Sequence, residues 1–442
     1  MISSQMSSQQ MTLGNHLFQV ELWDGVKDPL QDTHLVIDTE TLPIVLGKVP
    51  PVSTLQMYYP HSEFVQIVQG PEAIQLYLKR ALELNPGCEV VGHNFAFDFE
   101  VLGGRSNDLL MKAVSQSRAV CTGMRFMLKV MSEGKWQDHQ KWSLDFCLKS
   151  FHGLVLEKDQ ELRLSFKPDV PLTDAQIHYA ALDPVATWMV YEAMPNKMPT
   201  EGVQVKGAIC LNRISINGLR VNRKKLKSLQ EKFEKAVKLH ENVLHAFGYF
   251  IKVKNNTQRL QAILRNIELR SGLVFPRQTK NPDKICTGAK LVALYPDNVH
   301  PFLSAAKEQA HANKMLSTFL NDRFIGEDER VHPRINSMLA TTRTAMSDPP
   351  MQTIPKGDDI RGQYEAALGF CLLACDYCQQ ELLALAENCF IRFGFSKMME
   401  VIQSGVDIHK WFGKLIMQQS GGNINDGTDY RQLARNTWPL AV

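Results

Sequence analysis

Acidic residues lie at three places in the N-terminal half of the chain, at spacings that could build a metal site. Asp38 and Glu40 are two residues apart in the segment IDTE, Asp98 ends the segment HNFAFD, and Asp183 ends YAALD. On an extended strand, residues i and i+2 project from the same face, so one face can present both Asp38 and Glu40 to a cation. Taken alone, each acid is more typical of a surface carboxylate or a helix cap. In combination they indicate a site for hard divalent cations.

These acids need strands and helices to bring them together. LVID at 35–38 and EVVGHN at 89–94 are short apolar runs typical of buried strands, and helical spacing follows in 71–87, from 95 onward and in 173–194. The last helix begins at a capping residue, Thr173, and contains Pro184, which we expect only at a kink or a helix start. Alternating strands and helices predict an α/β domain.

The three segments also match known motifs. D-x-E, N-x-x-x-D from Asn94 to Asp98, and Y-x-x-x-D from Tyr179 to Asp183 occur in that order within about residues 30 to 195. This part of the chain resembles the DnaQ-like, or DEDD, 3′→5′ exonuclease superfamily in its Tyr subclass. The resemblance implies a ribonuclease H-like fold with a central mixed sheet, and a DNA contact for Asn94. The implied catalytic set is Asp38, Glu40, Asp98 and Asp183 as metal ligands, and Tyr179 to orient the attacking water.

The implied chemistry explains why four acids are needed. Hydrolysis of a phosphodiester places negative charge on the attacking and the leaving oxygen, and two Mg²⁺ ions about 4 Å apart can offset it. Mn²⁺ is a possible substitute, because carboxylates suit both ions. Tyr179 has an ordinary pKa of about 10, so we expect it to hydrogen-bond rather than to act as a base.

A second candidate site lies in residues 341–388. The segment from TTRTAMSDPPMQTIP to CDYCQQELL resembles the family A DNA polymerases. The family's region from T-G-R to I-R is matched by Arg343, Pro349, Gln352, Ile354, Pro355 and Arg361. Its motif A, D-Y-S-Q-I-E-L-R, is matched by Asp376, Tyr377, Gln379, Glu381 and Leu382. Cys378, Gln380 and Leu383 depart from that motif.

The polymerase resemblance implies a role for each matching residue. Asp376 would be a palm carboxylate that binds metal, and Glu381 would exclude a ribose 2′-hydroxyl. Tyr377 and Gln379 would face the incoming nucleotide. Arg343, Gln352 and Arg361 would contact DNA.

The resemblance weakens after GVDIHKWFG at 405–413. Motif B of the family is R-x-x-x-K-x-x-x-F-x-x-Y-G, whereas Arg431 is followed by Arg435 in the Lys position and Pro439 stands in place of Phe. Arg431 and Arg435 are still our candidate triphosphate contacts. Motif C, which brings the second palm carboxylate, has no match, so we expect a truncated polymerase region that does not extend a primer alone.

A basic amphipathic helix is predicted from residue 220 to 238. Leu226, Leu229 and Phe233 form its apolar stripe, and Lys224 and Lys225 are among the many charges on the rest. By itself this pattern is typical of a solvated helix face. In a chain that also carries a polymerase segment, the same pattern predicts that the helix contacts the DNA backbone and does not discriminate between DNA sequences.

Composition bounds the class of protein without naming a function. The 442 residues are 44% hydrophobic and 21% charged, which is ordinary for globular domains. The net charge of +3 gives no strong overall attraction to nucleic acid. Without a signal peptide, a membrane-length apolar run or an even cysteine set, we expect a soluble protein in the reducing cytoplasm of a bacterial or phage-infected cell. Cys375 and Cys378 lack further zinc ligands, and we expect them on and just after a buried strand.

We predict an α/β exonuclease domain, a mostly helical thumb and a partial α+β palm. The expected boundaries are a disordered tail at 1–16, the exonuclease domain at 17–195, the thumb at 196–330, and palm with the start of fingers at 331–442. A seam rich in proline and polar residues, MPNKMPTEG at 194–202, marks the first boundary between folded domains.

Three functions remain open. The leading hypothesis is a replicative, proofreading family A DNA polymerase, present as an N-terminal portion, with two Mg²⁺ ions per active site. Its partners would be primer-template DNA, single-stranded 3′ ends, deoxynucleoside triphosphates and either a separately encoded C-terminal fragment or a processivity factor. The alternatives are a stand-alone 3′→5′ exonuclease whose polymerase remnant binds DNA, and a non-catalytic assembly subunit.

Overall fold

The computed structural model describes residues 8–135, 141–157, 159–251, 256–279, 281–287, 299–339, 341, 343–355, 360–377 and 379–419. The chain divides into two compact units, residues 1–369 and 370–442, and each is described by itself. Within the described ranges, no helix has both the length and the apolar character needed to cross a membrane.

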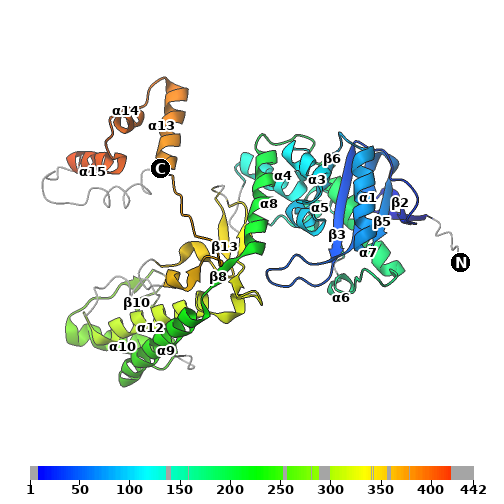
Figure 1. Cartoon of the computed structure of the whole chain (residues 1–442). Coiled ribbons are helices and arrows are strands. Elements are labelled where there is room, and N and C mark those ends of the chain that lie inside the picture. The colour runs from blue at the N-terminus through cyan, green and yellow to red at the C-terminus, as the bar shows by residue number, and fades with distance from the viewer. Residues whose placement is uncertain are drawn as a thin grey trace. The chain divides into compact units, whose positions relative to one another are not determined.

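A mixed sheet of seven strands forms the framework of the first unit, as expected (Figure 1). The strand order is β1-β2-β5-β4-β3-β6-β7. Three neighbouring pairs are parallel, namely β2 with β5, β3 with β6 and β6 with β7, and the other neighbouring pairs are antiparallel. The strands are β1 (Gln9–Leu13), β2 (His16–Leu22), β3 (His34–Thr41), β4 (Val52–Tyr59), β5 (Phe64–Gln69), β6 (Glu89–Gly92) and β7 (Ala119–Cys121).

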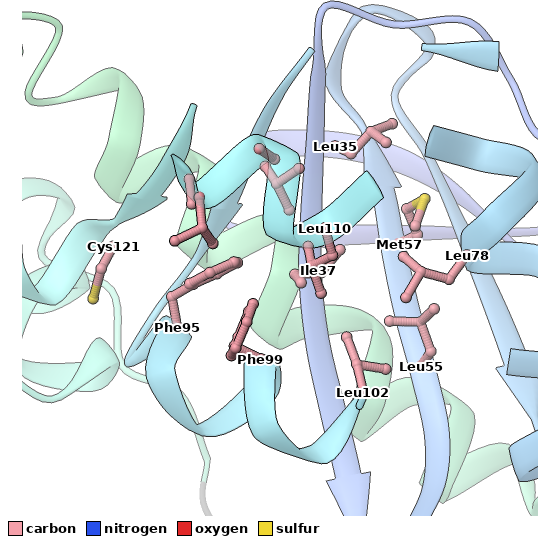
Figure 2. Packing of buried hydrophobic residues seen from close by; sticks show 14 of the residues in the cluster. Leu35, Ile37, Leu55, Met57, Leu78, Phe95, Phe99, Leu102, Leu110 and Cys121 are labelled. Atoms are coloured by element: carbon pink, nitrogen blue, oxygen red, sulfur yellow. The ribbon is translucent and has the colours of Figure 1, made fainter. Parts of the chain in front are cut away.

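Helices cover both faces of this sheet, because successive strand side chains point to opposite faces. Leu35 and Ile37 of β3 pack with α1 (Pro71–Leu84), α2 (Phe95–Val101) and α3 (Asp108–Ser115), and Figure 2 shows part of this core. Val36 points to the other face, which is covered by α5 (Leu144–His152) and α7 (Asp174–Glu192). All eight residues of β4 are buried as a result. The structure confirms the strands predicted at 35–38 and 89–94 and the helices predicted at 71–87 and 173–194, although their exact ends differ.

Helix α7 begins as predicted and continues through its proline. Thr173 accepts a hydrogen bond from the backbone N–H of Gln176, and the Gln176 side chain accepts one from the N–H of Thr173, which completes a capping box. Pro184 is buried inside the helix rather than at its start. Its packing against the sheet offsets the backbone hydrogen bond that a proline cannot make.

The prediction of a disordered tail at residues 1–16 is wrong for the part that the structure describes. Residues 9–13 form β1, which pairs with β2 from Gln9 opposite Val20 to Leu13 opposite His16. Met11 and Leu13 are buried against the sheet core, whereas Thr12 between them is exposed, as are Gln9 and Gln10. The Ser- and Gln-rich composition concealed this alternation.

Longer helices follow in the same unit. They are α8 (Glu201–Asn217), α9 (Arg223–Ala246), α10 (Asn256–Ser271) and α12 (Pro301–Thr318). Helix α9 is the predicted basic helix: Asn222 caps its N-terminus, and Leu226 and Phe233 are buried against Ala312 and Met315 of α12. Short strands complete this region: β8 (Leu219–Val221), β9 (Arg277–Gln278), β10 (Asn281–Ile285), β11 (Arg330–Val331), β12 (Arg334–Asn336), β13 (Ala345–Ser347) and β14 (Tyr364–Glu365).

The second unit contains α13 (Gln380–Phe393), α14 (Lys397–Gln403) and α15 (Ile408–Gln419) around a small core of Leu382, Val401 and Ile408. The buried strand predicted before motif A is wrong. Described residues 370–377 have no strand structure and are exposed, including Cys375, while Cys378 lies outside the described residues. An apolar run becomes a buried strand only where a neighbouring strand pairs with it, and none of the described strands does.

A buried ion pair joins α4 (Thr122–Ser132) to the start of α8. Arg125, 1% exposed, donates two hydrogen bonds of 2.9 Å to the carboxylate of Glu201, which is fully buried, and a third to the carbonyl of Met194. We expect Arg125→Met to destabilise the protein by about 3 to 5 kcal/mol, because it leaves the Glu201 charge buried without a partner. Urea unfolding checks this, and adding Glu201→Leu should recover most of the loss. A double variant no more stable than the single one would contradict this explanation.

Candidate active site

Three carboxylates meet where β3 lies beside α7. One carboxylate oxygen from each of Asp38, Glu40 and Asp183 lies within 4.8 Å of the other two. Asp38 and Glu40 come from the same face of β3, as their spacing predicts, and Asp183 comes from α7. Glu40 is only 7% exposed. Because like charges repel strongly where water is excluded, this arrangement favours a bound cation.

Asp98 of α2 lies next to these three. It is 3% exposed, and its carboxylate accepts a 2.7 Å hydrogen bond from the hydroxyl of Thr39, the residue between Asp38 and Glu40. Burial raises the pKa of Asp98 to about 7, with the nearby charge of Asp183 acting in the same direction and the Thr39 hydrogen bond opposing it. The charged form of Asp98 is therefore disfavoured until a cation is bound nearby.

This pKa predicts a stability effect of Asp98→Asn. A carboxyl group ionises near pH 4 in the unfolded chain but near pH 7 in the folded chain, so Asp98 lowers stability increasingly as the pH rises through that window. Without divalent cations, we expect Asp98→Asn to have little effect at pH 4 and to stabilise the protein by roughly 2 to 4 kcal/mol at pH 8. Thermal unfolding in EDTA measures this difference.

Asp169 supplies the control, because its side chain is exposed. Asp169→Asn, measured in parallel, corrects for effects that any Asp-to-Asn replacement has on unfolding. An Asp98→Asn effect that does not grow with pH would mean that Asp98 already ionises normally in the folded protein.

A cavity of about 800 Å³ opens over the acids. Its lining includes Asp98 and Tyr179 with the three clustered acids, and also two basic residues, Lys141 and Arg163. Burial, with the charges of Glu40 and Asp183, raises the pKa of Tyr179 above its ordinary value. Tyr179 therefore stays protonated near neutral pH and can donate a hydrogen bond into the cavity.

Asn94 and His93 lie at the same cavity, at the start of α2. Asn94 is exposed and has a left-handed backbone, with φ of 60°, which is uncommon outside glycine. The His93 ring bonds the hydroxyl of Thr122 and the carbonyl of Trp142, each at 2.8 Å. These contacts fix the turn that presents Asn94.

The candidate polymerase residues of the first unit are exposed near β13. Gln352 uses its side chain within its own segment: it accepts from the N–H of Met346 at 3.2 Å and donates to Thr344. Arg361 donates to the carbonyl of Ile354 at 3.0 Å, and Arg343 is exposed. Lys224 and Lys225 are exposed in the first turn of α9.

The motif A residues belong to the second unit. Asp376 and Tyr377 are exposed before α13, Gln379 has a left-handed backbone with φ of 55° at the helix N-cap, and Glu381 is exposed in the first turn. The triphosphate candidates Arg431 and Arg435 lie outside the described residues.

Sequence reasoning missed Thr39, Lys141 and Arg163. Thr39 had a local signal, because it stands between two candidate ligands and its side chain must point to the opposite face of β3, toward α2. Lys141 and Arg163 had no such sequence signal. Lys141 reaches the cavity from a loop and Arg163 from the short helix α6 (Gln160–Arg163), and neither segment carries a recognisable motif.

Two protein-family models match the chain. Residues 21–199 match the 3′-5′ exonuclease family, and residues 223–436 match DNA polymerase family A. The exonuclease match contains all of the clustered acids described above, and the polymerase match contains motif A.

Curated relatives agree with these matches. The chain is 29% identical over 253 residues to a thermostable DNA polymerase I of Thermus aquaticus, covering 52% of this chain and 29% of the relative. It is 31% identical over 209 residues to that of Thermus filiformis, covering 45% and 24%, and 22% identical over 343 residues to DNA polymerase I of Chloroflexus aurantiacus, covering 74% and 35%. The chain thus spans about a third or less of these relatives.

A solved structure shares the fold. It is the POL domain of Pol1 from M. smegmatis, in a complex with DNA primer-template and dNTP; the TM-score is 0.63 at 16% sequence identity, covering 93% of this chain and 67% of that one.

Proposed function

We propose that this chain, which belongs to the family A DNA polymerases and carries their 3′-5′ exonuclease domain, removes nucleotides from the 3′ end of DNA in the acidic cavity beside β3. One observation carries the proposal: Asp38, Glu40 and Asp183 place carboxylate oxygens within 4.8 Å of one another inside the segment matched as an exonuclease. In the cell this activity would proofread newly made DNA during replication.

The donor set fits the metal chemistry that this reaction needs. Asp38, Glu40, Asp98 and Asp183 offer only carboxylate oxygens, the ligands preferred by Mg²⁺ and Mn²⁺ rather than by softer metals. The raised pKa of Asp98 points the same way, because a buried carboxyl group with no cation nearby favours its neutral form. Two bound Mg²⁺ ions would supply charge stabilisation for the attacking and leaving oxygens.

The other residues of the cavity would bind and orient the substrate. Tyr179 would donate a hydrogen bond to the water that attacks the phosphorus and so align it. Lys141 and Arg163 place positive charge on the cavity lining, where they would attract the DNA phosphates. Asn94, exposed at the cavity edge, would contact the terminal nucleotides.

The polymerase region would supply duplex binding and part of a palm. Lys224 and Lys225 on α9 would contact the DNA backbone, and so would Arg343 and Arg361. Asp376 would hold a metal ion, Glu381 would exclude a ribose 2′-hydroxyl, and Tyr377 and Gln379 would face the deoxynucleoside triphosphate. Arg431 and Arg435 would contact its phosphates.

The second unit also supports a partner polypeptide for DNA synthesis. Its described core is small, while many large apolar side chains around α13 are exposed. Exposed apolar surface of this extent marks an interaction site. A polypeptide packed on the second unit would cover these residues: Phe370, Leu372, Leu373, Tyr377, Leu383, Leu385, Phe390, Ile391, Phe393 and Phe395. The bacterial relatives favour a bacterial or phage-infected cytoplasm as the site of action.

A nuclease assay tests the proposed activity. With Mg²⁺, the purified protein should shorten a single-stranded oligonucleotide labelled at its 5′ end one nucleotide at a time, releasing mononucleotides. EDTA should stop the reaction, and Mn²⁺ should restore it. An oligonucleotide with a blocked 3′ end should stay intact. Cleavage that starts at the 5′ end or inside the strand would refute the proposal.

A further inference from the structure

A second cluster of potential metal ligands lies at the opposite end of β3 from the acidic cavity. Asp32 precedes the strand, His34 opens it, and His61 lies in η1 (Pro60–Ser62), the connection between β4 and β5. One potential ligand atom from each of these three residues lies within 4.8 Å of the others. Strands β3 and β4 bring them together, because they pair antiparallel with Val36 opposite Tyr58.

Asp32 is held rigidly at the centre of this cluster. Its side chain is fully buried, and its carboxylate accepts hydrogen bonds from the backbone N–H groups of His34 and His61 at 3.0 and 2.9 Å. The ring Nδ1 of His61 lies 2.6 Å from the same carboxylate. The backbone of Asp32 is fixed as well, by a 2.8 Å hydrogen bond from its N–H to the side chain of Asn85.

Hydrogen bonds set which nitrogen of His34 can bind a metal. The hydroxyl of Tyr191 donates to Glu89 at 2.8 Å, so it accepts from Nε2 of His34 at 3.2 Å. Nδ1 of His34 then carries the lone pair, which accepts a 2.9 Å hydrogen bond from the hydroxyl of the exposed Thr33, and a bound ion would displace that hydroxyl. Metal-ligating histidines donate their other ring N–H to an outer acceptor, and the hydroxyl of Tyr191 fills that role for His34.

We propose that Asp32, His34 and His61 bind a divalent ion of the zinc type, separate from the ions of the acidic cavity. Two imidazoles and one carboxylate suit Zn²⁺, Co²⁺ or Ni²⁺, whereas Mg²⁺ prefers all-oxygen sites. Around a tetrahedral ion the ligand atoms lie about 3.4 Å apart, and the His61 side chain, 64% exposed, has room to move that far. The fourth position faces solvent and would hold water.

The bound ion would tie two segments together directly, because Asp32 and His34 lie just before and at the start of β3 and His61 lies in the β4–β5 connection. A third element, α7, is linked to the site through the hydrogen bond between Tyr191 and His34. The same helix carries Tyr179 and Asp183. The site is therefore placed to stabilise the framework of the acidic cavity without contributing a ligand to it.

Cobalt binding tests the proposal. In a variant with Asp38→Ala and Glu40→Ala, which lacks two acids of the other cluster, Co²⁺ should give the intense visible absorption of a four-coordinate ion at one equivalent per chain. Zn²⁺ should displace the cobalt and raise the melting temperature, and Mg²⁺ should do neither. Adding His61→Ala should weaken Zn²⁺ binding at least tenfold and remove the rise in melting temperature.

His61 is the right residue to change, since its exposed ring lets the alanine variant keep the fold, which its melting temperature without metal verifies. His152→Ala is the matched control: it removes an exposed histidine outside the cluster and should leave binding unchanged. Equal affinity with and without His61, or cobalt absorption dominated by thiolate charge transfer from the exposed cysteines, would overturn the proposal.

Discussion

Replacing Asp38 and Glu40 together by alanine is expected to reduce 3′-end degradation by about a thousandfold or more while leaving DNA binding largely intact. The two residues supply two of the three clustered carboxylates, so their loss removes most of the negative charge that would hold the cations. A thousandfold loss corresponds to about 4 kcal/mol of transition-state stabilisation, which is modest for metal-assisted phosphodiester cleavage. Rates of mononucleotide release and binding of a labelled oligonucleotide in EDTA measure the two properties.

A matched double variant separates the effect of removing two negative charges from the effect of removing two metal ligands. Glu72→Ala with Asp169→Ala also removes two acids, both exposed, and should cleave at the wild-type rate. The active-site double variant should also unfold at the same or a higher temperature in EDTA, because it relieves repulsion between carboxylates. A parallel loss of folding, binding and cleavage would attribute the effect to misfolding and would not support the proposed site.

The second large effect concerns DNA synthesis. We expect a polypeptide of these 442 residues to show no primer extension above background in the presence of Mg²⁺ and all four deoxynucleoside triphosphates. Nucleotidyl transfer needs two cations held together, and the palm match supplies one carboxylate, Asp376, which is exposed. The residue that we propose as a triphosphate contact also differs from the family pattern, because the sequence has Arg435 in the position of the motif B lysine.

A complementation experiment tests whether the missing motif C explains the absence of primer extension. Adding a polypeptide that carries motif C should restore extension, and Asp376→Ala should abolish the restored activity. Exonuclease activity of the same preparation, unchanged by Asp376→Ala, serves as the internal control for folding. Robust extension by the 442-residue polypeptide alone would show that another acid, such as Glu381, replaces the second palm ligand.

Local spacing predicted the parts of the acidic site that lie on single elements. The i, i+2 spacing of Asp38 and Glu40 and the i, i+4 spacing of Tyr179 and Asp183 need only a strand and a helix, and both elements formed as expected. The hydrogen bond from Thr39 to Asp98 spans 59 positions and depends on how α2 packs, which no local pattern encodes. The Asp32 cluster was missed for the same reason, since strand pairing brings His61 to it.

The two errors in the fold also have physical causes. The first dozen residues predict a disordered tail because they are rich in polar Ser and Gln, and this composition hides the short alternation of buried and exposed positions at 9–13. The apolar run FCLLAC at 370–375 predicts a buried strand, but burial of a strand depends on a neighbouring strand, which sequence composition does not supply. In both cases pairing between strands, rather than residue type, decided the outcome.

The complete burial of β4 has a consequence for hydrogen exchange. Every residue of Val52–Tyr59 is covered on both faces, and its backbone pairs with β3 on one side and β5 on the other. Such amides exchange with solvent only when the whole unit unfolds, so they report its global opening free energy. Asp38 and Glu40 are paired directly to this strand, opposite Gln56 and Thr54. Asp38 and Glu40 thus lie on a strand paired to backbone that we expect to exchange slowly, and their relative positions should survive the local openings that release loops and helix ends.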